Sequence, residues 1–303
     1  MKLKVCAFIG AFSFFLLSAA AWRGYGDDRD ACILAKFRDK LIQSYDKDEN
    51  AKLPAQVRVD FGNETPESLF KYFLKIWKNG TADFLAQKKL LQKIAQDEAP
   101  TKEELASFKL ARARFKQLRF AFASFDKTHE YPEHLDEFTT SMGKIQDALS
   151  NHSPDTAAKL AGRILPKWNA EGLRKIEKET GQFDPSSKKS FYRWIGNELN
   201  DLEGLLNRPT LSSKGIHDAR KILARQNAVF FILDAVDSTP ETAATLNYLS
   251  TWNAQLGDFH DDLVRRVTRG ELDEKKDPIV FPPGLKAQAL EYIEKMRAFL
   301  DKN

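Results

Sequence analysis

The feature that most constrains this chain is an apolar periodicity of 3.6 residues, which recurs along almost the whole sequence. Strand-like alternation is missing except around residues 57–61. Because apolar residues at the longer spacing fall on one face of a helix, the pattern predicts one amphipathic helix after another. Hydrophobic residues make up 42% of the chain and charged residues 30%, a balance typical of a globular protein. We therefore predict an all-α fold.

Capping residues, glycines and prolines divide the periodic pattern into separate helices. Thr65 and Pro66 form a typical helix start, and Gly80 is a typical helix end. Residues 46–64 and 273–283 are polar or contain proline, so we expect them to connect helices. The same reasoning predicts helices at residues 65–80, 81–97, 102–127, 132–150, 154–181, 185–206, 212–236, 240–269 and 283–301.

The first 21 residues have the pattern of a secretory signal peptide. Lys2 and Lys4 form a short positive region, residues 5–17 are apolar, and residues 18–21 are small. Signal peptides share this order of regions, and the apolar run is too short for a comfortable transmembrane helix. We predict cleavage near Ala21, a secreted or periplasmic location, and no transmembrane anchor after processing.

One side of the helix predicted at residues 212–236 is almost entirely basic. Its basic residues fall within one arc of roughly 140° when the chain is placed at 100° per residue. A solvated helix face usually mixes acidic and basic residues, but here only Asp218 interrupts the stripe. We call this set the second basic stripe, and its members are Lys214, His217, Arg220, Lys221 and Arg225.

A similar stripe lies on the helix predicted at residues 102–127, where no acidic residue occurs from position 107 through position 125. Moving 108 residues back from His217 reaches its first member, Lys109. A pattern that occurs twice indicates an internal repeat. The members of this first basic stripe are Lys109, Arg112, Lys116 and Arg119.

Each stripe is followed by a predicted helix that carries a glycine and, four residues later, an aspartate. The first copy has Gly143 and Asp147, and the second has Gly257 and Asp261. Glycine within a helix costs about 1 kcal/mol relative to alanine, so the paired glycines indicate close approach of two helices. We expect each aspartate to lie near the basic stripe of its own half, where it either orients an Arg or Lys of the site or forms a purely structural ion pair.

The order of these elements resembles the CHAD family, the conserved histidine α-helical domain. The resemblance covers about residues 106–303, and Lys109 stands where the first-repeat histidine of that family would be expected. It rests on a weaker first copy and on two motifs of the second copy, which read His217-Asp218-x-Arg220-Lys221 and Leu256-Gly257-x-x-His260-Asp261.

The resemblance implies two pseudo-repeated antiparallel helical bundles with an extra N-terminal helical segment. Its domains are a signal peptide at 1–21, an extension at 22–100, and a CHAD-like domain at 101–303 with repeats 101–208 and 209–303. Proteins of that family bind inorganic polyphosphate, and the domain has no established catalytic activity. The resemblance therefore implies a non-enzymatic protein with no cofactor or metal, in which both basic stripes contact a polyanion with support from Asp147, His260 and Asp261.

Elementary electrostatics favours the same class of ligand. The formal net charge is only +4, so any affinity for a polyanion must come from local clustering of the basic residues. A row of Lys and Arg releases the counterions condensed on a linear phosphate chain. Base recognition uses interleaved exposed aromatics, which the stripes lack, so we expect no sequence-specific nucleic-acid binding. His217 and His260 are expected to add positive charge as the pH falls.

Two alternatives stay open at this point. One is an exported helical scaffold that binds a protein partner or an anionic envelope glycolipid through an exposed patch of Phe70, Phe73 and Trp77, although buried core is the better interpretation of that spacing. The other is a metal-dependent phosphohydrolase in which His217, His260 and neighbouring aspartates hold divalent ions. The surrounding cations argue against the second, because they repel a metal ion.

Overall fold

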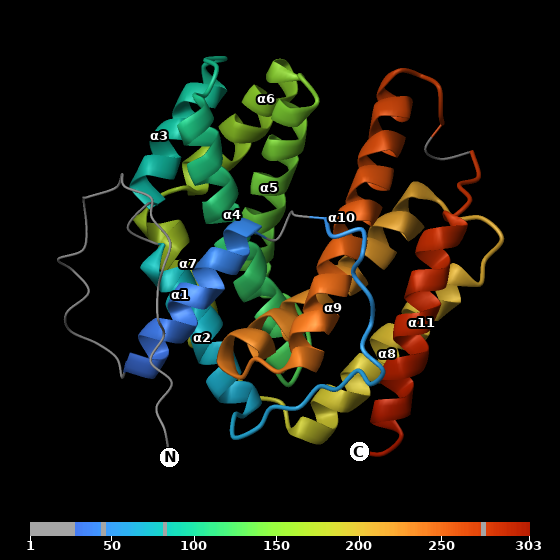
Figure 1. Cartoon of the computed structure of the whole chain (residues 1–303). Helices are drawn as coiled ribbons and strands as arrows, with labels where there is room; N and C mark the ends of the chain where they lie inside the picture. Colours follow the sequence, from blue (N-terminus) through green and yellow to red (C-terminus); the bar gives the residue numbers. More distant parts are fainter. Residues whose placement is uncertain (1–27, 44–46, 81–83, 274–276) are drawn as a thin grey trace.

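A computed structural model describes residues 28–43, 47–80, 84–273 and 277–303 of the chain. Within these ranges the protein forms eleven α-helices, one short 3-10 helix and no β-strand, which confirms the all-α prediction (Figure 1). The helices are α1 (Asp28–Gln43), α2 (Pro66–Asn79), α3 (Phe84–Ala95), α4 (Lys102–Phe125), α5 (Glu133–Ser150), α6 (Pro154–Ile164), α7 (Ala170–Thr180), α8 (Lys188–Leu206), α9 (Ser213–Val236), α10 (Pro240–Thr268) and α11 (Pro283–Leu300).

The helix starts follow from local capping chemistry. Thr65, Thr101 and Thr239 each accept a hydrogen bond from the backbone N–H three residues later, and that third residue bonds back to the threonine N–H. Such reciprocal caps satisfy N–H groups that have no partner inside a helix and contribute about 1 kcal/mol each. Ser212 caps α9 through a single bond, in which its hydroxyl oxygen accepts from the Gly215 N–H at 3.2 Å.

The prediction of one helix at residues 154–181 is wrong, because the chain breaks there into two helices. Helix α6 ends at Ile164, and residues Leu165–Lys167 form the short 3-10 helix. Pro166 has no N–H to continue the α-helical ladder, so the chain turns at this point. Asn169 then caps α7 by accepting from the Glu171 and Gly172 N–H groups at 2.9 and 3.0 Å.

Helix α9 lies between two groups of helices. In Figure 1, helices α3 to α7 gather on one side of the molecule and α8, α10 and α11 on the other. Between Ala219 and Ala235 most side chains of α9 are buried, which suits a helix covered on several sides. The basic residues of α9 lie between Lys214 and Arg225, and its last two turns carry no basic residue.

The residues before α4 pack into the same core as the rest of the chain. Phe37 of α1 meets Phe231 of α9 edge to face at 4.5 Å, and Phe84 of α3 stacks on Trp168 at 4.8 Å. Phe70, Phe73 and Trp77 of α2 are all buried. The exposed aromatic patch considered for a scaffold protein is therefore wrong, and the core interpretation of these residues is confirmed.

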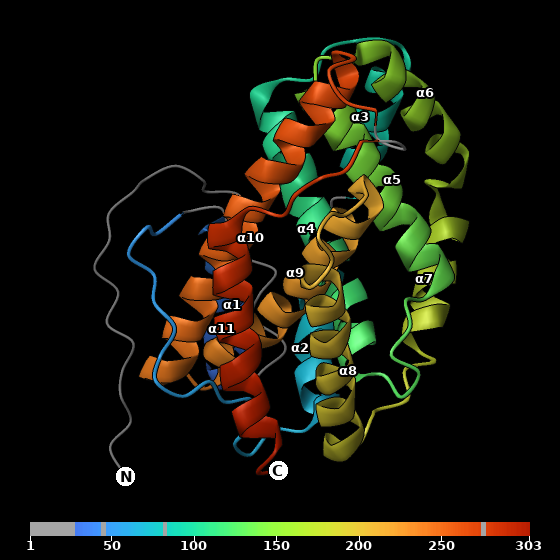
Figure 2. The same ribbon diagram turned by 90° about the vertical axis from the view of Figure 1, so that its right-hand side faces the viewer.

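Residues 47–64 run as an extended strap across α10, α11 and α8 (Figures 1 and 2). The Asp48 N–H donates to Thr251 Oγ1 at 3.1 Å, Lys295 Nζ donates to the Pro54 carbonyl at 3.0 Å, and the Tyr192 hydroxyl donates to the Val59 carbonyl at 3.1 Å. Three side chains of the strap itself, Val57, Val59 and Phe61, are buried. The alternation seen at residues 57–61 thus reflects a strap with one buried face.

The predicted signal peptide, residues 1–21, lies outside the described residues. Among the helices that the structure describes, none combines the length and the apolar character that crossing a bilayer requires.

Candidate functional site

The two basic stripes meet where α4, α5, α9 and α10 come together. Arg112 of α4 donates from Nη1 to Gln146 Oε1 of α5 at 3.2 Å. Arg220 of α9 has its Nη1 3.2 Å from His260 Nδ1 of α10 and 4.0 Å from Asp261 Oδ1. Each arginine therefore reaches from a basic helix to the helix that follows it in the chain.

The paired glycines make room for these two arginines. A Cβ atom added at Gly143 would lie 2.8 Å from Arg112 Nη2, and one added at Gly257 would lie 3.5 Å from Arg220 Nη2. The nearest neighbour of each glycine is thus a guanidinium group from the basic helix that precedes it in the chain. The expectation that these glycines permit close approach of the two helices stays a prediction. The similar placement of the two pairs agrees with an internal repeat of the halves, although the repeat itself stays a prediction.

Lys116 lies among these arginines. Burial is the main cause that lowers the pKa of Lys116 to about 7, and the charges of Arg112, Arg220 and Arg119 lower it further. In the unfolded chain this lysine keeps its ordinary pKa near 10.5, so the unfolded state binds more protons between pH 7 and pH 10. The contribution of Lys116 to the free energy of unfolding therefore rises with pH over that range and is least favourable below pH 7.

His217 and His260 approach each other from α9 and α10, with ring centroids 5.9 Å apart. Burial, together with Lys221, His260 and Arg220, lowers the pKa of His217 to about 4. His217 is therefore uncharged at neutral pH in the free protein and gains its positive charge only at acidic pH.

Asp147 and Asp261 lie beside the arginines from α5 and α10, as expected. Desolvation raises the pKa of Asp147, although Arg112 and Arg220 act to lower it and Asp261 acts to raise it further. A hydrogen bond from His260 and the charge of Arg220 lower the pKa of Asp261. We call the whole group the central cluster, and its members are Arg112, Lys116, Asp147, His217, Arg220, His260 and Asp261.

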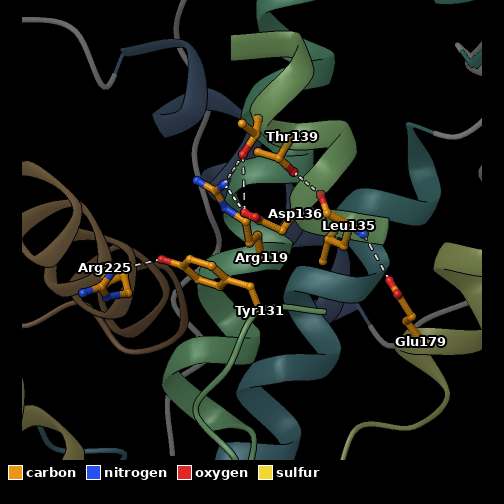
Figure 3. Close-up of polar contacts among 8 residues, drawn as sticks. Arg119, Tyr131, Leu135, Asp136, Thr139, Glu179 and Arg225 are labelled. Carbon is orange, nitrogen blue, oxygen red and sulfur yellow. Dashed lines mark hydrogen bonds and ion pairs between the residues drawn. The ribbon is translucent and has the colours of Figure 1, made fainter. Parts of the chain in front are cut away.

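Arg225 is held away from the central cluster by a buried carboxylate. Its Nε and Nη2 donate to the two oxygens of Glu198 on α8 at 2.6 and 2.7 Å. Its Nη1 donates to the Tyr131 hydroxyl at 2.9 Å, the bond drawn in Figure 3. The two charged side chains are only 13% and 11% exposed. Each of the three nitrogens of this guanidinium thus donates to an acceptor. Arg225 therefore has a structural role in the free protein.

Arg119 has a similar role on the other side of Tyr131. Its Nη1 donates to Asp136 Oδ1 of α5 at 2.6 Å, and its guanidinium carbon lies 4.8 Å from the centroid of the Tyr131 ring (Figure 3). Stacking of this kind is favourable for a guanidinium on an aromatic face. Tyr131 thus contacts the last arginine of each basic stripe, Arg119 on α4 and Arg225 on α9. Through the carboxylate partners of these arginines, the same network includes α5 and α8.

The remaining basic residues of the stripes lie outside the central cluster. Lys109 is exposed on α4, and Lys214 is exposed and pairs with Asp218 at 2.5 Å. Lys221 lines an open groove of about 430 Å³ between α8 and α9, together with Arg208 and Arg225. The structure therefore brings three predicted basic side chains together, Arg112, Lys116 and Arg220, and places the others at or beyond the edge.

Glu198, Tyr131 and Asp136 were missed in the sequence, although Glu198 carries a signal. It interrupts the apolar stripe of α8 that contains Ile195, Leu199 and Leu202. Acidic residues are almost never fully buried without a partner, so a carboxylate in a buried stripe indicates a cation on a neighbouring helix. No comparable pattern identifies which cation it is.

Two further properties bear on the chemistry of the site. Within the described ranges, no group of three or more His, Cys, Asp or Glu side chains is placed to hold a metal ion, so the phosphohydrolase alternative finds no ligand set there. In the same part of the chain, Val280 is the one large hydrophobic side chain that is exposed.

Comparison with known protein families, curated proteins and solved structures gives no match to any family model, curated protein or structure. The resemblance to the CHAD family consequently stays a prediction that rests on the motifs quoted above.

Proposed function

We propose that this protein binds inorganic polyphosphate or a related phosphate-rich polyanion at the central cluster, without catalysing a reaction on it. The observation that carries the proposal is that Lys116 lies close enough to Arg112 and Arg220, cations from two different helices, for their charges to lower its pKa. Holding like charges together costs free energy in the free protein. An anion that bridges them would recover that energy, and perturbed groups of this kind cluster at binding sites.

The chemistry of the cluster suits a phosphate chain better than the alternatives. Arginine offers forked donors to adjacent phosphate oxygens, and lysine offers a compact charge. The sequence resemblance to the CHAD family implies the same ligand. A secreted or periplasmic location is part of this proposal, and it rests on the signal-peptide pattern of residues 1–21.

The proposal is tested by removing charge from the cluster. We expect the triple variant Arg112→Gln, Lys116→Gln and Arg220→Gln to lose about 100-fold or more in affinity for long-chain polyphosphate, because each side chain supplies a phosphate contact. Isothermal titration calorimetry of the purified protein would measure this. With three contacts, wild-type affinity should also fall roughly 20-fold or more between 50 and 200 mM salt.

A matched control removes the same charge elsewhere. Lys71, Lys127 and Lys175 are exposed and each belongs to a surface ion pair, so their triple change to Gln should keep most of the affinity. Circular dichroism would show that both variants stay helical. Equal binding by the two triple variants would overturn the proposal, since net charge alone would then account for any affinity.

The lowered pKa of Lys116 predicts how binding depends on pH. A polyanion favours the charged amine, so binding takes up a proton wherever the free lysine is neutral, which is above about pH 7. We expect wild-type affinity to weaken as the pH rises from 7 to 9, by at most about tenfold per unit. Lys116→Arg should bind with little change over this range, because arginine stays charged. A wild-type affinity that is constant from pH 6 to pH 9 would contradict this role of Lys116.

A further inference from the structure

The acidic partners of the basic stripes are of two kinds. Glu198 and Asp136 lock Arg225 and Arg119 with contacts of 2.6 to 2.7 Å. Asp261 stands 4.0 Å from Arg220, at the limit of an ion pair, and its side chain is 63% exposed. Asp147 is also exposed. The carboxylates of the central cluster are therefore close enough to screen the arginines without being locked to them.

The glycines and carboxylates of the central cluster lie directly beside its arginines. Gly143 and Gly257 present no side chain to the arginines, and the Asp147 and Asp261 carboxylates lie near enough to raise each other's free energy when both are ionised. Two arginines and one lysine thus face two carboxylates, which leaves the cluster close to neutral in the free protein. A weakly charged anion therefore gains little electrostatic binding free energy at such a site.

We propose that Asp147 and Asp261 set the minimum charge of the anion that the central cluster accepts, because they compete with it for Arg112 and Arg220. This inference rests on the proposed function and concerns the selectivity of the same site among anions of different charge. A short anion has only the central cluster to bind and meets both carboxylates. A long chain also reaches cations outside it, such as Lys109 and Lys221, so the same repulsion is a smaller part of its binding free energy.

The test compares two ligands, tripolyphosphate and long-chain polyphosphate, on the full protein with the double variant Asp147→Asn and Asp261→Asn. Asparagine keeps the size of aspartate, and both positions are exposed, so the fold should persist. We expect the variant to bind tripolyphosphate at least tenfold more tightly than the wild type, and long-chain polyphosphate by a smaller factor. The ratio of the two affinities should fall accordingly.

The control is the double variant Asp258→Asn and Asp262→Asn, which makes the same charge change on α10. Asp258 pairs with Lys47 and Asp262 with Arg265, and both are exposed. An equal gain in affinity in this control would overturn the inference, and so would the absence of a gain in the Asp147 and Asp261 variant. In either case the proposed function stands if the wild type binds polyphosphate. If only the Asp147 and Asp261 variant binds, the inference stands and the proposed function of the natural protein fails. If neither binds, both fail.

Discussion

Replacing Glu198 by leucine is expected to lower the free energy of unfolding by about 3–5 kcal/mol, because the change leaves Arg225 buried without its carboxylate. Arg225→Leu should cost a similar amount, since it strands the carboxylate instead. Both side chains are nearly nine-tenths buried and share two hydrogen bonds of 2.6 and 2.7 Å. Chemical denaturation of the two single variants would measure the loss directly.

The double variant separates the cost of an unpaired charge from the value of the pair. Two leucines of similar volume leave no buried charge, so the double variant should be more stable than either single variant. An exposed pair provides the matched control: Glu67→Ala removes the partner of Lys71 on α2, where both side chains are more than half exposed, and should cost less than about 0.5 kcal/mol. Losses below 1 kcal/mol in both buried variants would show that water reaches this pair.

The second large effect is expected at Gly172, in the first turn of α7. A Cβ atom there would lie 2.0 Å from the Lys167 carbonyl oxygen and 3.0 Å from Phe138 Cζ. The oxygen belongs to the backbone of the turn before Asn169, so it cannot swing aside as a side chain would. We expect Gly172→Ala to destabilise the protein by about 1–3 kcal/mol or more, through overpacking and loss of the Asn169 cap.

Gly162 of α6 provides the matched control for that change. No atom lies within 4 Å of a Cβ added there, and alanine is a better helix former than glycine. Gly162→Ala should therefore raise the melting temperature, with a gain of about 0.5–1 kcal/mol. A Gly172→Ala variant as stable as the wild type would mean that the turn at Pro166 and Asn169 relaxes more easily than its packing indicates.

Local sequence patterns predicted most of the helices. The 3.6-residue periodicity and the threonine and serine caps act within a few residues, so α2, α4, α9, α10 and α11 agree with the predicted ranges to within two residues at either end. The prediction was wrong at residues 154–181, where Pro166 lies within a continuous amphipathic pattern. There Pro166 lacks the N–H that an α-helix needs, and Asn169 caps a new helix, so the chain breaks despite the continuous periodicity.

The candidate site was predicted only in part. The stripes identified Arg112, Lys116 and Arg220, and the expected positions of Asp147 and Asp261 beside them were correct. A helical wheel cannot show that Arg225, which falls on the same arc as Arg220, turns toward α8 and pairs with Glu198. That difference depends on which helix covers each edge of the stripe, and neighbouring helices come from distant parts of the chain.

Local patterns in the chain were enough to predict the class of the fold, the ends of most helices and the concentration of basic residues on two of them, because these properties depend on neighbours a few positions apart. The packing of the helices, by contrast, sets which cations of the two basic stripes are not locked in buried ion pairs. Packing buried Arg225 and Arg119 against carboxylates. It also buried Lys116 and brought it close to Arg112 and Arg220, and these changes lowered its pKa to about 7. Charge interactions and desolvation depend on distances in space, which are set only when the helices have packed.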